Sequence, residues 1–248
     1  MNDSIQAIRR YLEANNLGCL DIKAALIDMD GVLFDSMPLH TLAWKHLSDD
    51  LGIEASRDEF YLYEGMTGVA TVNLLFRRRF GSEPDVEEAR RLYKVKAGYF
   101  QSMGRPAAMP GALDMLSCLK REGIERVLVT GSGQPDILRR IDDEYQGLFE
   151  KHLRITAADV KHGKPHPEPY LMAQQRVDAL PSQTIVIENA PLGVEAGHAS
   201  GAFTIAITTG PVPKQSFVDS GADLIFDSMP QFAEQLPHLI QLFRDTSL

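Results

Sequence analysis

The sequence predicts an α/β fold in which a parallel sheet, covered by helices, is interrupted by an inserted all-helical segment. Two observations predict it. Short apolar, β-branched runs alternate with helical patterns along the chain, as expected for strands joined by crossover helices. In addition, about a hundred residues separate the first such run from the second, far more than one crossover helix requires.

The predicted strands are continuously apolar, which is typical of a sheet buried on both faces. They cover residues 24–27, 126–130, 153–156, 184–187, 203–207 and 223–226. Helical patterns between them cover residues 111–122, 136–142, 167–175 and 192–200. This alternation indicates a Rossmann-like three-layer core.

The long interval after the first strand is helical throughout. Pro38 opens it, and the stretch GRPAAMPG (104–111) closes it with several helix breakers. We therefore predict a helical cap domain at residues 37–106, joined by two hinges to an α/β core made of residues 1–36 and 107–248. Residues 1–20 add a short amphipathic helix that Gly18 closes.

Charge and composition exclude several kinds of partner. The 248-residue chain has a net charge of −9, which argues against nucleic acid and anionic membranes, since both select for basic patches. A small anionic substrate stays possible. No apolar run approaches the roughly 20 residues of a membrane span, and the N-terminus does not resemble a signal peptide. Two cysteines, Cys19 and Cys118, both interpreted as buried thiols, favour a cytoplasmic protein.

Two carboxylates, Asp28 and Asp30, follow the first strand in the stretch ALIDMDGVLFDS. Ligands of open α/β sheets bind beyond the carboxyl ends of the strands, so this is where a site is expected. A single Asp at a strand end often only forms a turn or caps a helix. Two carboxylates this close together can divide nucleophilic and acid–base roles if their environments differ.

The next two strands deliver a hydroxyl group and a lysine. Thr130 ends the second strand, and the turn Gly131-Ser132-Gly133 lets backbone N–H groups approach an anion. This turn matches neither the Walker nor the dinucleotide-binding spacing. Lys164, between a glycine and a proline after the third strand, is placed to fix a charge at the same edge.

The fourth strand delivers Glu188 and Asn189. Together with Asp28 and the main chain at Asp30, their oxygens suit Mg²⁺, which prefers oxygen ligands and also binds substrate phosphates. Asn189 has an alternative role as the cap of the following helix. The sequence therefore predicts a magnesium cofactor.

This order of paired aspartates, hydroxyl, lysine and acidic–amide pair resembles the haloacid dehalogenase-like hydrolase superfamily. The stretch DMDGVLFDS resembles its first motif; Thr130, Lys164 and Glu188-Asn189 match the second, third and fourth. The helical insertion resembles the small cap of the family. DMDGVLFDSMPLHTLAWKHL and GKPHPEPY are most similar to the β-phosphoglucomutase-like branch, which also holds many sugar-phosphate phosphatases.

The resemblance implies a role for each residue. Asp28 would attack the substrate phosphorus and become a phospho-aspartate. Asp30 would protonate the leaving oxygen, then accept a proton from the next acceptor, with its main-chain oxygen toward Mg²⁺. Thr130 and the following backbone N–H groups would hold phosphate oxygens, and Lys164 would balance the negative charge.

Two departures from the family pattern affect these expectations. The fourth motif is usually Glu-Asp, whereas this chain has Asn189 in the second position. We favour Glu188 as the ligand that compensates. The mutase branch also carries an arginine in its first cap loop, and the stretch YEGMTGVATVN has Gly68 or a neighbour there and no arginine. Lys94 or Lys96 is a candidate replacement for that charge.

Further substrate-binding candidates are Gly131 and Ser132 in the core and His40, Trp44 and Lys96 in the cap. His40 and Trp44 lie one helical turn apart and share a helix face. They are interpreted as lining the substrate entrance. The alternative for Trp44 is a structural role in packing.

The favoured function is a Mg²⁺-dependent phosphatase of a small sugar phosphate. The alternative is a β-phosphoglucomutase, an isomerase that interconverts β-glucose 1-phosphate and glucose 6-phosphate by returning the phosphoryl group to the sugar. A non-catalytic metabolite-binding protein on the same fold is a third possibility, against which the four intact motif residues argue. The expected partner is a small phosphorylated metabolite; the oligomeric state is open, with a monomer favoured.

Overall fold

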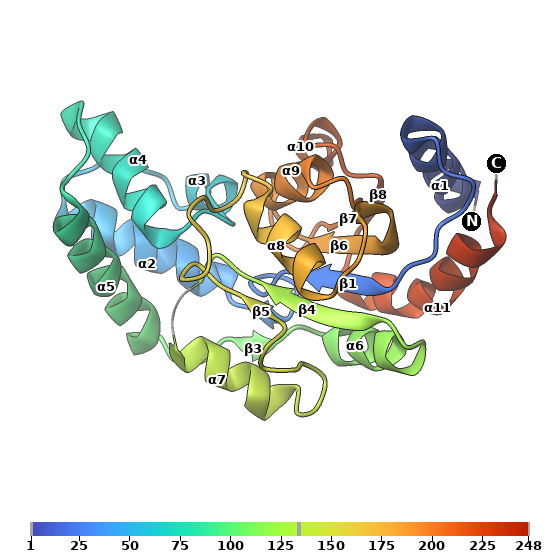
Figure 1. Cartoon of the computed structure of the whole chain (residues 1–248). Helices are drawn as coiled ribbons and strands as arrows, with labels where there is room; N and C mark the ends of the chain where they lie inside the picture. Colours follow the sequence, from blue (N-terminus) through green and yellow to red (C-terminus); the bar gives the residue numbers. More distant parts are fainter. Residues whose placement is uncertain (1, 133–134, 248) are drawn as a thin grey trace.

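A parallel sheet forms the centre of the protein. The computed structural model describes residues 2–132 and 135–247, and in them six strands pair in the order β5-β4-β1-β6-β7-β8 (Figure 1). These strands are β1 (Ala24–Ile27), β4 (Glu125–Val129), β5 (Arg154–Ile155), β6 (Thr184–Glu188), β7 (Phe203–Ile207) and β8 (Leu224–Phe226). Ile27 of β1 aligns with Leu128 of β4 and Ile187 of β6, so the C-terminal ends of these three strands lie side by side.

Helices cover both faces of this sheet (Figure 1). One face packs against α1 (Asn2–Asn15), α6 (Ala112–Arg121), α7 (Pro135–Glu144) and α11 (Met229–Asp245). The other packs against α8 (Glu168–Arg176), α9 (Pro191–Ala199) and α10 (Lys214–Asp219), with the short η1 (Pro181–Gln183) preceding β6. Ala25 and Ile27 point into the first layer, and Ala24 and Leu26 into the second. The predicted α/β class with a three-layer core is thereby confirmed.

Four helices follow β1 in the chain and precede α6. They are α2 (Met37–Asp50), α3 (Glu59–Leu62), α4 (Gly68–Phe80) and α5 (Val86–Ser102). They enclose an apolar cluster of their own, which includes Trp44, Phe60 and Leu92. The antiparallel pair β2 (Phe34–Asp35) and β3 (Ala107–Ala108) stands at the two crossings to the core. We call residues 37–106 the cap; the domain boundaries themselves stay a prediction.

Some details of the fold differ from the prediction. The first helix ends at Asn15, before Gly18, because Asn16 adopts the left-handed conformation (φ +53°) and the Leu17 N–H bonds to the Leu12 carbonyl. Cys19, predicted to be buried, is exposed. Neither α10 nor α11 was predicted. In the two described ranges, no helix is both long and apolar enough to cross a membrane.

Replacing Leu26 by alanine is expected to destabilise the protein by about 2–5 kcal/mol, since the side chain is fully buried in the central strand. Leu113→Ala on α6 is the matched control: its side chain is 54% exposed, and we expect a change within about 0.5 kcal/mol. Urea unfolding followed by circular dichroism measures both. If both variants lost the same free energy of unfolding, the position of β1 in the core would be contradicted.

Candidate active site

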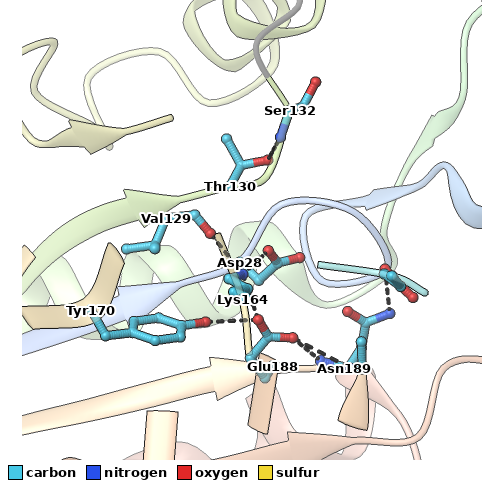
Figure 2. A network of polar contacts seen from close by, with 10 residues as sticks. Asp28, Val129, Thr130, Ser132, Lys164, Tyr170, Glu188 and Asn189 are labelled. Atoms are coloured by element: carbon cyan, nitrogen blue, oxygen red, sulfur yellow. Dashed lines mark hydrogen bonds and ion pairs between the residues drawn. The ribbon is translucent and has the colours of Figure 1, made fainter. Parts of the chain in front are cut away.

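The ends of neighbouring strands bring four polar side chains together (Figure 2). Asp28 follows β1, Thr130 follows β4, Glu188 ends β6, and Lys164 lies in the loop after β5. Because β4 and β6 flank β1 in parallel register, their ends must lie beside Asp28. All four side chains are buried, although charged groups rarely are unless they are paired.

Lys164 joins two of these carboxylates. Its Nζ donates to Asp28 Oδ1 at 2.5 Å, to Glu188 Oε1 at 2.5 Å and to the Val129 carbonyl at 3.1 Å, so each of its three hydrogens has an acceptor. Burial alone would lower the pKa of Lys164, but the charges of Asp28 and Glu188 outweigh burial and raise it above the ordinary value. The ammonium therefore stays charged and balances the buried carboxylates.

Glu188 is held from all sides. Its Oε1 also accepts from the Tyr170 hydroxyl at 2.7 Å, and its Oε2 accepts from the backbone N–H groups of Asn189 at 3.0 Å and Ala190 at 3.3 Å (Figure 2). Both carboxylate oxygens are thus engaged in fixing Lys164 and the turn into α9. This leaves Glu188 poorly suited to bind a further ligand.

Asp30 is the end of a second polar chain that leads into the cap. Its Oδ1 accepts from Ser36 Oγ at 2.5 Å and lies 3.1 Å from His40 Nε2. The other ring nitrogen of His40, Nδ1, lies 2.5 Å from Lys96 Nζ. The Lys96 ammonium also lies 5.0 Å from the Trp44 ring centroid, within reach of a cation–π contact. Asp30 is therefore linked to a buried cap lysine through one histidine.

Burial and mutual contacts shift the pKa values of Asp30, His40 and Lys96. Burial alone would raise the pKa of Asp30, but the charge and hydrogen bond of His40, with Ser36 and Lys96, lower it overall. Burial and then the Lys96 charge lower the pKa of His40. Burial lowers the pKa of Lys96 to about 7. With Lys96 as the donor at Nδ1, His40 donates from Nε2 to Asp30, which is the hydrogen-bond pattern of a neutral imidazole.

A cavity of about 60 Å³ lies between these groups and the cap. The core lines it with Asp28, Asp30, Gly131 and Ser132; the cap contributes polar groups and aromatic rings, among them His40, Trp44, Tyr63, Glu64, Tyr93 and Lys96. Both the core and the cap thus contribute to the lining of this cavity.

The mutase-like branch carries an arginine at Gly68 or a neighbouring position, and at Gly68 a side chain would fit only if Tyr93 moved. A Cβ on Gly68 would lie 2.1 Å from the Tyr93 ring, so that ring fills the space. Of the two candidate lysines, Lys96 is buried at the cavity and Lys94 is exposed.

The oxygens around Asp28 suit a hard cation. Across the two described ranges, no three His, Cys, Asp or Glu side chains are placed to hold a metal ion. The predicted donor set is different: the Asp28 and Glu188 carboxylates, the main-chain oxygen of Asp30 and the amide oxygen of Asn189. Asn189 is 4% exposed, and within the part of the chain that the structure describes its Oδ1 has no hydrogen-bond partner. Burial and neighbouring carboxylates also raise the pKa of Asp28, which a bound cation would relieve.

The predicted site residues lie in these networks or line the cavity, except Thr130, which contacts Ser132 beside them; the roles assigned to them stay predictions. Trp44 fits both interpretations, because it packs in the cap cluster and faces the cavity. Within the phosphate turn, Ser132 N–H donates to Thr130 Oγ1 at 3.0 Å, and Gly133 lies outside the described residues. Three contributors were missed, namely Ser36, Glu64 and Tyr170. No pattern in the sequence distinguishes them from ordinary helix and loop residues.

Comparison with known proteins agrees with this arrangement. The model of the haloacid dehalogenase-like hydrolase family matches residues 22–201. The match covers most of the chain, including every strand-end residue described above. The protein therefore belongs to the haloacid dehalogenase-like hydrolase family and is an enzyme.

Individual relatives include both phosphatases and mutases. Hexitol phosphatase A of Escherichia coli is 31% identical over 84% of this chain and 92% of its own length. β-Phosphoglucomutase of Bacillus subtilis is 27% identical over 88% and 94%. A solved structure from Bacteroides vulgatus, provisionally assigned as a β-phosphoglucomutase, is 42% identical with a TM-score of 0.94, covering 99% of both chains.

Lys96→Met is expected to stabilise the protein at pH 7 and much less at pH 10. The folded-state pKa of about 7 lies below the ordinary 10.5, so between these values the unfolded chain binds more protons and wild-type stability rises with pH. Below this window the burial cost is fully present. The gain is on the order of 4 kcal/mol at pH 7 and under about 1 kcal/mol at pH 10, less about 1 kcal/mol for the lost His40 contact.

Thermal and urea unfolding at the two pH values measure this difference. Lys94→Met, on the exposed side of the same helix, is the matched control and should show no such pH dependence. A gain in the Lys96 variant that is the same at both pH values would contradict the burial of a cation there.

Proposed function

We propose that the protein is a Mg²⁺-dependent phosphatase of small sugar or sugar-alcohol phosphates that works through a phospho-aspartate at Asp28. One observation carries the proposal. The Asp28 carboxylate lies buried at the end of the central strand, paired with Lys164, and lines the same cavity as Asp30, whose side chain Ser36 and His40 hold in place. A fixed nucleophile and a separately held carboxyl are what the two-step reaction requires.

In the first step an Asp28 oxygen attacks phosphorus, and the bond between phosphorus and the sugar oxygen breaks. The leaving oxygen needs a proton, which Asp30 supplies. Asp30 acquires this proton as the anionic substrate enters, because added negative charge raises the pKa of a neighbouring carboxyl. His40 keeps the carboxyl oriented through its Nε2–H bond.

Positioning of the phosphoryl group falls to the strand ends. Thr130 and the backbone N–H groups after it would hold the non-transferred oxygens, while Lys164 offsets the charge that accumulates around Asp28. Bound Mg²⁺ would supply further positive charge and keep Asp28 ionised. We assign it to Asp28, the Asp30 main-chain oxygen and Asn189 Oδ1. Asn189 is preferred over Glu188 because both Glu188 oxygens are already engaged.

In the second step water attacks the phosphorus of the phospho-aspartate. Asp30, now ionised, accepts the proton of that water, and the bond between Asp28 and phosphorus breaks. Inorganic phosphate forms and the Asp28 carboxylate is restored. The cap admits substrate and releases product, and its aromatic rings with His40 and Lys96 suit a polyhydroxylated substrate. The relative that acts on hexitol phosphates supports the same substrate class.

A β-phosphoglucomutase is the second candidate, favoured by the likeness to the Bacteroides vulgatus structure and the Bacillus subtilis enzyme. Such an enzyme must hold a second phosphate in the cap. Tyr93 fills the space at Gly68, and the buried cap lysine, Lys96, is already engaged with His40. Neither group is arranged as a free phosphate site, so we favour the phosphatase.

The products of one incubation distinguish the two candidates. The enzyme with Mg²⁺ is given β-glucose 1-phosphate and a catalytic amount of glucose 1,6-bisphosphate, and in parallel a panel of hexose and hexitol phosphates. We expect free phosphate from at least one panel member. Glucose 6-phosphate formed without free phosphate would contradict the phosphatase assignment and establish the mutase.

Asp28→Asn should abolish either activity by several orders of magnitude, because it removes the nucleophile. Asp21→Asn, an exposed change of the same kind, should leave activity intact. EDTA should silence the wild type, and added Mg²⁺ should restore it. Full activity of Asp28→Asn would overturn the proposed mechanism.

A further inference from the structure

The cap loop 63–67 is seated directly on the strand-end loops of the core. A Cβ on Gly131 would lie 2.8 Å from the Gly65 carbonyl oxygen, and a Cβ on Gly163 would lie 2.7 Å from Thr67 Cγ2. Gly65 in turn packs against Lys164, where an added Cβ would be 3.1 Å from its Cδ. Glycines on both sides therefore allow a close fit between this loop and the site.

One side chain of this loop reaches the fourth strand end. Asn189 Nδ2 donates to Glu64 Oε1 at 3.1 Å. The nitrogen end of the amide thus faces Glu64, whose oxygen accepts the hydrogen bond. The oxygen end then points the other way. In Figure 2 the Asn189 oxygen lies on the side of Asp28, and the nitrogen on the opposite side.

The backbone after the first strand restricts the same amide. A Cβ on Gly31 would lie only 1.9 Å from Asn189 Nδ2, so the amide fills the space that a side chain would take there. Gly31 also has a φ of +80°, a conformation that favours glycine. The amide is thus packed against the turn at Asp30 and Gly31. Its Oδ1 is buried and, among the described residues, without a partner.

We propose that Glu64 is a positioning residue for the cation site: by holding the nitrogen end of Asn189, it presents the amide oxygen to the metal. This rests on the proposed function, which assigns Asn189 as a ligand.

Coupling between the cap and the cation follows. Glu64 belongs to the cap and Asn189 to the core, so the ligand is oriented only while loop 63–67 is docked. If docking of the loop increases the affinity for the cation by some factor, binding of the cation favours the docked loop by the same factor. Metal binding and cap docking are therefore linked even before substrate arrives.

Mn²⁺ binding without substrate tests the proposal. The free-ion electron paramagnetic resonance signal gives the dissociation constant for the wild type and for Glu64→Ala, Glu64→Gln and Glu87→Ala. We expect Glu64→Ala to weaken binding about 10–100-fold, as the loss of groups that orient ligands does. Glu64→Gln keeps an acceptor without the charge and should fall between. Glu87, whose side chain is 85% exposed, is a cap carboxylate away from the site, and its variant should bind as the wild type does.

Two further measurements separate positioning from a general structural effect. Mn²⁺ should slow hydrogen exchange of the amides in loop 63–67 of the wild type and not in Glu64→Ala. In addition, Glu64→Gln combined with Asn189→Asp exchanges the carboxylate and the amide, so its Mn²⁺ affinity should recover toward that of the wild type.

Wild-type Mn²⁺ affinity in folded Glu64→Ala would overturn the proposal. Asn189→Leu distinguishes this failure from a failure of the ligand assignment. If Asn189→Leu loses binding while Glu64→Ala keeps it, only the positioning role is wrong. If both bind normally, Asn189 is not a ligand and the assignment in the proposed function is wrong as well.

Discussion

The charge of the Lys164 ammonium is the constraint on which the rest of the site depends. It is surrounded by the carboxylates of Asp28 and Glu188 and by one carbonyl, all within hydrogen-bond distance. Burying such a cluster brings little net stability, whereas removing one partner leaves an uncompensated charge. The cluster is therefore better explained by function: it holds a carboxylate rigidly at the end of a buried strand. The order of β4, β1 and β6 in the sheet makes this possible.

The cap supplies residues that contact the site residues at the strand ends of the sheet. Its helix α2 carries His40 to Asp30, its helix α5 carries Lys96 to His40, and its loop 63–67 carries Glu64 to Asn189. Asp30 and the proposed cation ligand Asn189 thus each contact a residue of the cap. The cavity between cap and core is lined by residues of both. Movement of the cap away from the core would admit substrate and break these contacts. Its return would restore them and exclude water from the site.

The sequence predicts the parallel sheet and the strand-end residues because both follow from local patterns. An apolar run ending in Asp28, or a lysine fixed beside Pro165, is visible without coordinates. Contacts between distant segments are not. Glu64 reaches Asn189 because glycines let two loops approach closely. The hydrogen bond from Tyr170 to Glu188 likewise joins residues whose proximity the sequence does not reveal. The end of α1 was misplaced because Asn16, not Gly18, takes the left-handed conformation.

The central claim is that Asp28, held by Lys164, forms a covalent bond to phosphorus. Its most direct test mixes the enzyme with Mg²⁺ and a sugar phosphate that it hydrolyses, and quenches the reaction with acid within milliseconds. The protein is then reduced with borohydride and analysed by peptide mass spectrometry. Borohydride converts an acyl phosphate, and not a free carboxyl, to the alcohol. We predict that this reduction is found at Asp28 and is absent without substrate. Reduction at another residue, or none during active turnover, would contradict the account.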